Sequence, residues 1–190
     1  MLRWPSYGYR KGEPMPLPKS SYYERLVVQF PDSPLKGFAQ WRVAECGYRP
    51  STYYGTKQLA VLDEGARNFL IKQYEKVLAP TGTLPWALAQ VRLGRVRYWM
   101  GDFNAAVTHF QAVSENMPPG VERISALLDL SLTLSRLGNN EKAHVALDVV
   151  KSMPNVELTS SSHGHYGTLI KDEVDSQEIA EDFAQRLSSQ

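Results

Sequence analysis

The sequence lacks several features on which enzymes, metal-binding proteins and secreted proteins depend. Its 190 residues include one cysteine, Cys46, which excludes an intrachain disulfide and any metal site built from several cysteines. No apolar run approaches the roughly 18 residues needed to cross a bilayer, so we expect no membrane insertion. The first 20 residues contain basic side chains but no apolar core of a secretory signal. We therefore expect a soluble intracellular protein, and the sequence does not distinguish the mitochondrial matrix from the cytoplasm.

The charge balance and the absence of catalytic motifs narrow the function classes further. Lys and Arg total 21 and Asp and Glu total 20, whereas proteins that grip phosphate backbones usually carry a basic excess. The chain has no glycine-rich phosphate loop, no G-x-S-x-G elbow and no acidic triplet for a divalent ion. We expect no catalysis, no cofactor and no small-molecule substrate, and we do not expect nucleic acid as the default partner.

The histidines and the cysteine provide the only candidate metal ligands or nucleophiles of interest. His163 and His165, in the stretch SSSHGHYG, could both face one metal ion, but two ligands make a weak site. His109 and His144 lie on separate predicted helices, and neither has a cysteine or carboxylate at convincing ligand spacing. Cys46 also lies on a predicted helix, where it suits a small buried apolar group better than a nucleophile. The prediction is no metal site and no catalytic residue.

Helical periodicity, interrupted by proline and glycine, runs through most of the chain. Apolar residues recur at helical spacing over 21–30, 34–46 and 56–78, and Asp32 or Ser33 can cap the second of these helices. No stretch alternates apolar and polar residues convincingly over the length of a strand. The sequence therefore predicts an all-α fold with almost no sheet.

A repeat with a period of 37 residues is the clearest internal pattern. The matching pairs are Leu93 and Leu130, Gly101 and Gly138, Ala106 and Ala143, Phe110 and Leu147, and Val113 and Val150. Each unit predicts a helix that ends at a glycine in the left-handed conformation, followed by a second helix capped by Asp102 or Asn140. The paired alanines are small because two helices approach closely there, and Phe110 and Leu147 fill the wedge between hairpins.

Residues 86–154 resemble the tetratricopeptide repeat family. The first unit carries six residues in the register of that family, namely Leu93, Gly94, Gly101, Ala106, Phe110 and Pro118. Arg97 and Val113 stand where a tyrosine and a second alanine are usual, and the second unit is looser, with Ser131 in place of a glycine. The resemblance implies antiparallel helix hairpins stacked as a short right-handed superhelix. Because the family period is about 34 residues, we expect the extra three to lengthen the loop around 116–122.

The predicted organisation has four parts. Residues 1–20, rich in proline and aromatic residues, form either an extended arm that lies along another surface or a disordered terminus, and residues 21–154 form the repeat domain. Two clear repeats cover 86–154, and degenerate ones cover 21–80. A flexible linker over 155–171 leads to an amphipathic helix over 172–190. In that helix Ile179, Phe183 and Leu187 recur every four residues, and Ser176 can cap it. We expect it to shield the last repeat rather than to bind outside the protein.

The resemblance also implies a partner-binding wall on the first helix of each hairpin. Carried over residue by residue, the wall comprises Leu88, Val91, Arg95, Tyr98, Trp99, Leu128, Leu132 and Arg136, with Ser125 and Ser135 beside them. An apolar wall predicts an amphipathic helix or peptide as ligand, or a wall already filled from within. Arg95 is expected to meet a carboxylate of the partner. Trp4, Tyr7 and Tyr9 of the arm are predicted as further anchors.

These patterns favour a non-catalytic protein–protein interaction module. The leading prediction is a tetratricopeptide-like scaffold or structural subunit of a larger multiprotein complex, such as a mitochondrial one. An RNA-binding helical repeat is the alternative, with Arg92, Arg95 and Arg97 as its basic cluster. A bacterial envelope-assembly adaptor, to which residues 22–46 are similar, is a further alternative, and a metal-dependent enzyme is the least favoured.

Overall fold

The computed structural model describes residues 20–47, 62–155, 157–158 and 174–188. These residues form eight helices and one two-stranded antiparallel pair, so the all-α expectation is confirmed. The elements are α1 (Ser20–Gln29), α2 (Lys36–Gly47), α4 (Glu64–Tyr74), α5 (Leu84–Trp99), α6 (Phe103–Asn116), α7 (Val121–Arg136), α8 (Asn140–Ser152), β1 (Glu157–Leu158), β2 (Val174–Asp175) and α9 (Ser176–Ser188). The predicted arm over 1–20, except its last residue, lies outside the described residues.

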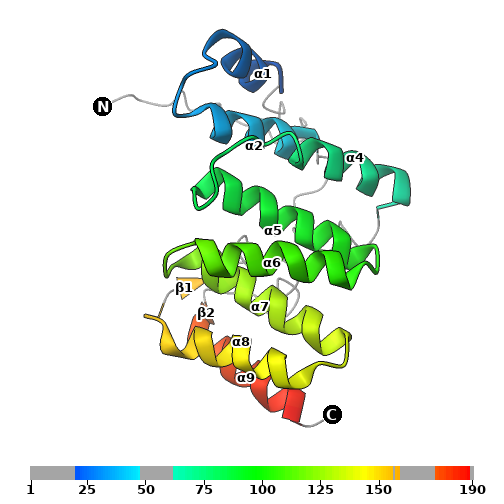
Figure 1. Cartoon of the computed structure of the whole chain (residues 1–190), viewed down its shortest axis with the longest axis vertical. Coiled ribbons are helices and arrows are strands. Elements are labelled where there is room, and N and C mark those ends of the chain that lie inside the picture. Colours follow the sequence, from blue (N-terminus) through cyan, green and yellow to red (C-terminus); the bar gives the residue numbers. More distant parts are fainter. Residues whose placement is uncertain (1–19, 48–61, 156, 159–173, 189–190) are drawn as a thin grey trace, which may run out of the picture.

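The helices stack in one column, with α1 at one end and α9 at the other (Figure 1). Helices α2, α5, α7 and α9 contact one another in that order. On the other side of this series, α4 packs on α2 and α5, α6 packs on α5 and α7, and α8 packs on α7 and α9. Each helix is therefore held by its sequence neighbours and by the hairpin next to it. The winding of these hairpins into a right-handed superhelix stays a prediction.

The 37-residue period is visible in the helix boundaries. The helix pair α7–α8 begins 37 residues after the pair α5–α6, at Val121 and Asn140 against Leu84 and Phe103. The helices themselves take 16 and 14 residues in the first unit, and the connection between α6 and α7 takes only residues 117–120. The loop that the sequence predicts to be lengthened is therefore short, because long helices account for most of the period.

The turn inside each hairpin follows the predicted chemistry, with one correction. Gly101 and Gly138 have φ values of 81° and 74°, the left-handed region in which glycine is least strained. Asp102 caps α6 by accepting a hydrogen bond from the amide of Ala105 at 3.3 Å. The expected cap Asn140 is wrong, since Asn139 accepts from the Lys142 amide instead. Helix α8 already includes Asn140, so the preceding residue occupies the cap position.

Small residues let the paired helices approach closely, as the repeat pattern predicts. Ala106, Ala143, Phe110 and Leu147 are all fully buried in one apolar core that extends from α5 to α9. Gly94 is the tightest point of this packing, because the ring of Phe110 lies directly against its Cα. The interior therefore depends on the absence of a side chain at residue 94.

The C-terminal helix closes the stack. Ile179, Phe183 and Leu187 are each less than 10% exposed and pack into the same core, against α8 and α7. This arrangement agrees with the expectation that α9 shields the last repeat. The predicted cap Ser176 is wrong, because Ser176 is the first residue of the helix and Asp175 accepts the hydrogen bond from the Gln177 amide at 2.8 Å. None of the described helices is long and apolar enough to span a membrane.

Replacing Gly94 with alanine should destabilise the fold. The added methyl group would lie 2.5 Å from Cε1 of Phe110, so the ring or the helix must shift. We expect a loss of about 1–3 kcal/mol in the free energy of unfolding, the usual cost of overpacking a core. Gly65 is a matched control in the exposed first turn of α4, where the nearest atom to an added methyl group is 3.4 Å away. Urea unfolding should show Gly65→Ala unchanged or slightly stabilised, and equal effects of the two substitutions would contradict the close approach.

Candidate functional site

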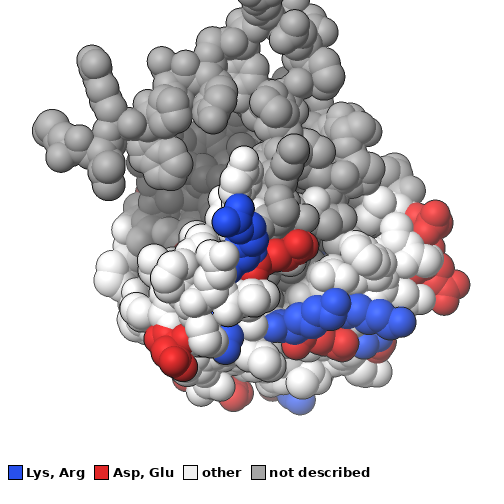
Figure 2. Space-filling model, turned by 90° about the horizontal axis from the view of Figure 1, so that it is seen from above, with Lys and Arg blue, Asp and Glu red and all other residues white. Residues whose placement is uncertain are grey.

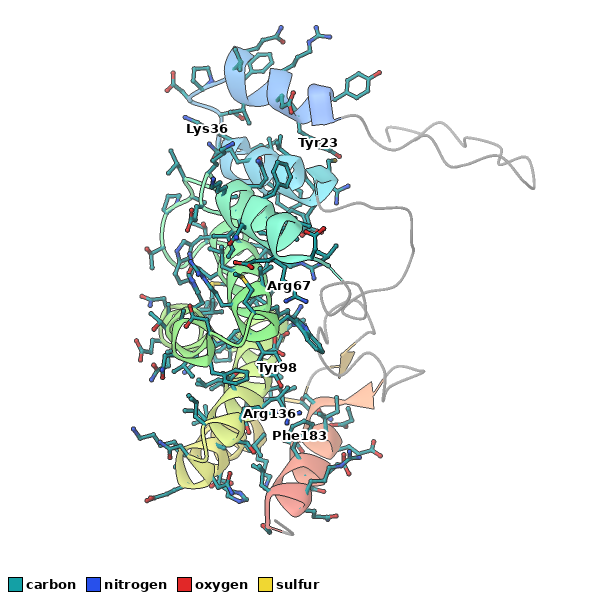
Figure 3. All side chains as sticks on the ribbon, turned by 90° about the vertical axis from the view of Figure 1, so that its right-hand side faces the viewer. Tyr23, Lys36, Arg67, Tyr98, Arg136 and Phe183 are labelled. Carbon is teal, nitrogen blue, oxygen red and sulfur yellow. The ribbon has the colours of Figure 1, made fainter. Side chains whose placement is uncertain are left out.

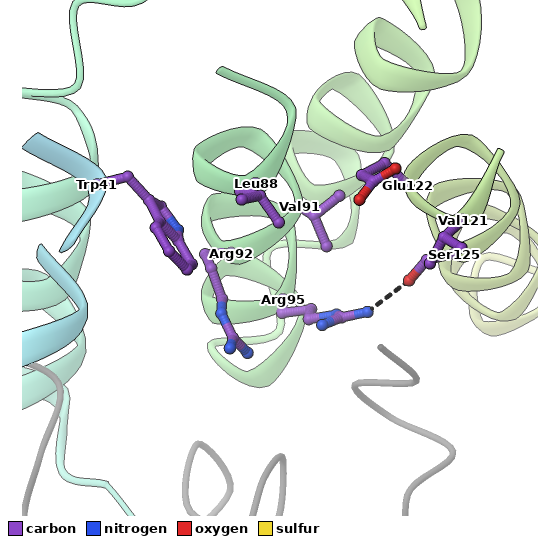
Figure 4. A pocket seen from close by; sticks show the side chains of 8 residues that line it. All are labelled: Trp41, Leu88, Val91, Arg92, Arg95, Val121, Glu122 and Ser125. Carbon is purple, nitrogen blue, oxygen red and sulfur yellow. Dashed lines mark hydrogen bonds between the residues drawn. The ribbon is translucent and has the colours of Figure 1, made fainter. Parts of the chain in front are cut away.

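A small pocket opens where α2, α5 and α7 lie side by side (Figure 4). Its volume is about 70 Å³. The lining residues are Trp41, Leu88, Val91, Arg92, Arg95, Val121, Glu122 and Ser125. The exposed surface of the lining is mostly apolar, and its charged residues are two arginines, Arg92 and Arg95, and one acid, Glu122. The pocket therefore presents an apolar cavity with both signs of charge in its lining.

Helical spacing explains why these residues meet. Leu88 lies three and four residues before Val91 and Arg92, and Arg95 lies four and three residues after them, which places all four on one side of α5. Val121 and Ser125 are one turn apart at the start of α7. Helix α2 brings the indole of Trp41 to the opposite wall, as the close view shows (Figure 4). Three helices from different parts of the chain thus build the cavity.

A buried ion pair lies at one side of the pocket. Nε of Arg95 lies 2.7 Å from Oδ2 of Asp129, and the side chains of the two residues are 4% and 1% exposed. A second guanidinium nitrogen of Arg95 donates to Oγ of Ser125 at 2.8 Å, which Figure 4 marks with a dashed line. The expectation that Arg95 meets a carboxylate of a partner is therefore corrected. The carboxylate comes from the chain itself, because a guanidinium this deeply buried needs a charged acceptor in the folded protein.

The predicted basic cluster is also neutralised within the chain. Arg92 pairs with Glu45 at 3.0 Å, and Arg97 lies 3.6 Å from Asp102. With Arg95 bound to Asp129, each of the three arginines faces an acidic residue. This arrangement argues against a row of free cations that could track a phosphate backbone.

The predicted binding wall divides into two groups. Leu88, Val91 and Arg95 line the pocket, whereas Tyr98, Trp99, Leu128, Leu132 and Arg136 do not. Leu128 is 1% exposed and belongs to the core shared with α9. The hydroxyl of Tyr98 on α5 accepts a hydrogen bond from Nε of Arg136 on α7 at 3.2 Å (Figure 3). Side chains of the chain itself thus occupy much of the wall, which is the second of the two alternatives that the sequence left open.

The remaining members of the wall support the core from its edge. Trp99 and Leu132 are half-buried and pack against the cluster that contains Leu128. Tyr98 meets the rings of Trp99 and Phe103 edge-on, at centroid distances of 5.7 Å and 5.2 Å. Trp4, Tyr7 and Tyr9, the predicted anchors of the arm, lie outside the described residues. Aromatic contacts therefore occupy the end of α5 that was expected to face a partner.

Sequence reasoning missed four lining residues, Trp41, Arg92, Val121 and Glu122. Arg92 and Val121 lie one turn from the predicted residues Leu88 and Ser125, so helical spacing alone could have added them. Trp41 could not be placed in the same way. Helix α2 belongs to the part of the chain where the repeat pattern fades, and only the packing of α2 on α5 shows that the indole reaches the pocket.

Two of the four histidines, His109 and His144, and the cysteine lie on described helices. Nδ1 of His109 lies 2.7 Å from Oε1 of Gln90 on the neighbouring helix. Among the described residues no group of three or more His, Cys, Asp or Glu side chains could hold a metal ion. Cys46 is half-buried on α2, and His163 and His165 lie outside the described part of the chain.

Breaking the Arg95–Asp129 pair from one side should be far more costly than replacing both partners. We expect Arg95→Met to lower the free energy of unfolding by about 3–5 kcal/mol, because Asp129 is left as a buried unpaired charge. The double variant Arg95→Met/Asp129→Leu should lose much less than the sum of the single variants. Denaturant unfolding of the four proteins gives the coupling energy. Arg186→Met, which breaks the exposed pair with Asp182, should cost about 0.5 kcal/mol or less. Additive effects of the two core substitutions would contradict a direct pair.

The neutral form of His109 should contribute a pH-dependent part of the stability. Burial, followed by the charge of Arg97, lowers the pKa of His109 below its ordinary value of 6.5. The unfolded chain therefore binds more protons at acidic pH, so this contribution is complete above about pH 6.5 and is lost as the pH falls through the folded pKa. The variant His109→Gln should lose less stability than the native chain between pH 7 and pH 5. Unfolding curves of the native chain and of His109→Gln, measured at pH 7 and at pH 5, check this. The same loss of stability in both proteins would contradict it.

No protein-family model, curated protein sequence or solved structure matches this chain. The resemblance to the tetratricopeptide family therefore rests on the residues of the chain and stays a prediction. The proposed function therefore rests on the described geometry, a stack of helices with a small apolar pocket.

Proposed function

We propose that this chain is a non-catalytic protein-binding scaffold built from tetratricopeptide-like hairpins. The observation that carries the proposal is the apolar pocket where α2, α5 and α7 meet. In the proposed mode, a partner helix or peptide inserts one apolar side chain beside Trp41, Leu88 and Val91. Helix-in-groove recognition works through such anchors, which stand at helical spacing on the bound segment.

The size of the pocket supports a protein anchor rather than a small molecule. Pockets for small molecules and cofactors are usually about 300–1,000 Å³, whereas this one is about 70 Å³. Glu122 flanks the apolar lining and would pair with a polar group beside the inserted side chain. Partner side chains at the edge of an interface supply such groups.

The rigidity of the surrounding helices supports the same proposal. Arg95 is fixed by Asp129 and Ser125, so one side of the pocket has little conformational freedom to lose when a partner binds. We extend the proposal to a permanent place in a larger multiprotein assembly, such as a mitochondrial one. A fixed subunit suits a chain whose acidic and basic groups balance and whose pocket offers no reactive group.

The proposal predicts that a charge in the pocket removes the partner. The full chain, tagged and purified gently from its source, should carry other chains in constant ratio, as measured by native mass spectrometry. Leu88 is half-buried in the lining, so we expect Leu88→Glu to lower recovery of these chains by about tenfold or more, the effect of losing one interface anchor. The control Val145→Glu changes a side chain that is 58% exposed on α8 and should retain them.

Two outcomes would contradict this function. A chain that purifies alone, with the native fold shown by circular dichroism, excludes a fixed subunit. Recovery of RNA instead of protein, with retention that falls steeply as salt rises, would favour the RNA-binding alternative.

A further inference from the structure

A second concave surface lies at the N-terminal end of the stack, apart from the pocket. This groove is bounded by α1, α2 and the end of α4, and its volume is about 250 Å³. The lining residues are Glu24, Val27, Val28, Gln40, Val43, Gln73 and Lys76. Helix α2 contributes Gln40 and Val43 here and Trp41 to the pocket, so the two cavities lie on different sides of α2.

One of the two most exposed large apolar side chains of the described residues lines this groove. Val28 lines it and is 77% exposed. Leu78 is equally exposed, and its amide donates to Oε1 of Gln40, which also lines the groove. Within the part of the chain that the structure describes, eight of the eleven exposed large apolar side chains lie between residues 22 and 78, so exposed apolar side chains are concentrated in the first half of the chain. The opposite end is closed by α9. Contiguous apolar surface of this kind marks interaction sites in soluble proteins.

The two walls of the groove carry opposite charges. Glu24 stands on α1, and Lys76 stands just beyond the end of α4 on the other side. Both residues are exposed. Seen from the α1 end (Figure 2), most of the described surface is uncharged, and acidic and basic groups lie next to one another. An occupant that brings one acid toward Lys76 and apolar side chains toward the valines would match this groove.

Helix α1 itself has that chemistry. Glu24 and Val28 are one turn apart on the side of α1 that faces the groove, with Val27 beside them. We propose that the groove-facing side of α1 from a second copy packs over this groove, and that the two copies form a two-fold symmetric dimer. A two-fold interface pairs each contact twice, so Glu24 of each copy meets Lys76 of the other copy. Each Val28 then packs between the apolar walls of the other groove. This surface goes beyond the proposed function, because the dimer leaves the α2–α5–α7 pocket unused.

Light scattering coupled to size-exclusion chromatography tests the dimer with the full native chain. The mass should rise with concentration from that of one chain to that of two. Val28→Glu should keep the mass of one chain at concentrations where the native protein is a dimer. Val145→Glu places the same charge on exposed α8 and should dimerise like the native chain. A native chain that stays monomeric at every concentration would overturn the proposal, whatever else covers the groove.

A charge exchange identifies the paired residues. Glu24→Lys and Lys76→Glu should each raise the dimer dissociation constant by about tenfold, because each replaces two attractive contacts with two repulsive ones. The double variant Glu24→Lys/Lys76→Glu restores opposite charges across the interface and should return the constant to near the native value. Circular dichroism controls for the fold of each variant. A dimer that tolerates Val28→Glu, or a double variant weaker than both single variants, would place the contact elsewhere. None of these results depends on the partner of the pocket, so the two proposals fail independently.

Discussion

The ion pair between Arg95 and Asp129 is the contact on which the arrangement of α5 and α7 depends. Both groups are almost completely removed from water, so each requires the other in a fixed position. A pair of this kind adds little net stability compared with apolar residues of the same size, but a shift of one helix along the other would leave two buried charges unpaired. The pair therefore selects one register of the two helices. The pocket depends on that register, because α5 supplies Leu88 and Val91 while α7 supplies Val121 and Ser125.

Local chemistry explains which features could be predicted from the sequence. Gly101, Gly138 and Asp102 act within a few residues of their own position, so their types report the turn and the cap directly. The role of Arg95 was misread because Asp129 lies 34 residues away, on a different helix. From the sequence alone, a buried internal partner and an external one give the same pattern. Trp41 was missed for a related reason, since α2 has no clear repeat register that would orient it toward α5.

The two ends of the stack differ in how well their apolar side chains are covered. Helix α9 covers the last hairpin with Ile179, Phe183 and Leu187, which the amphipathic pattern of the sequence predicts. At the first hairpin, α1 packs on α2 and still leaves Val28 exposed, beside an apolar groove. A repeat stack needs a cover at each end, because every unit buries its apolar face only against a neighbour. The proposed dimer would supply the cover at the N-terminal end.

The short strands β1 and β2 bring together two points of the chain that are far apart in sequence. Glu157 pairs with Asp175 and Leu158 pairs with Val174, while Asn155 hydrogen-bonds to Asp175 and Ser176. The start of α9 is thereby fastened to the end of α8. These contacts hold the start of α9 by themselves, and the entropy of joining two points of a chain depends only weakly on the length of the segment between them. We therefore expect the helical column to tolerate a change in the length of that segment, including the insertion of a reporter domain.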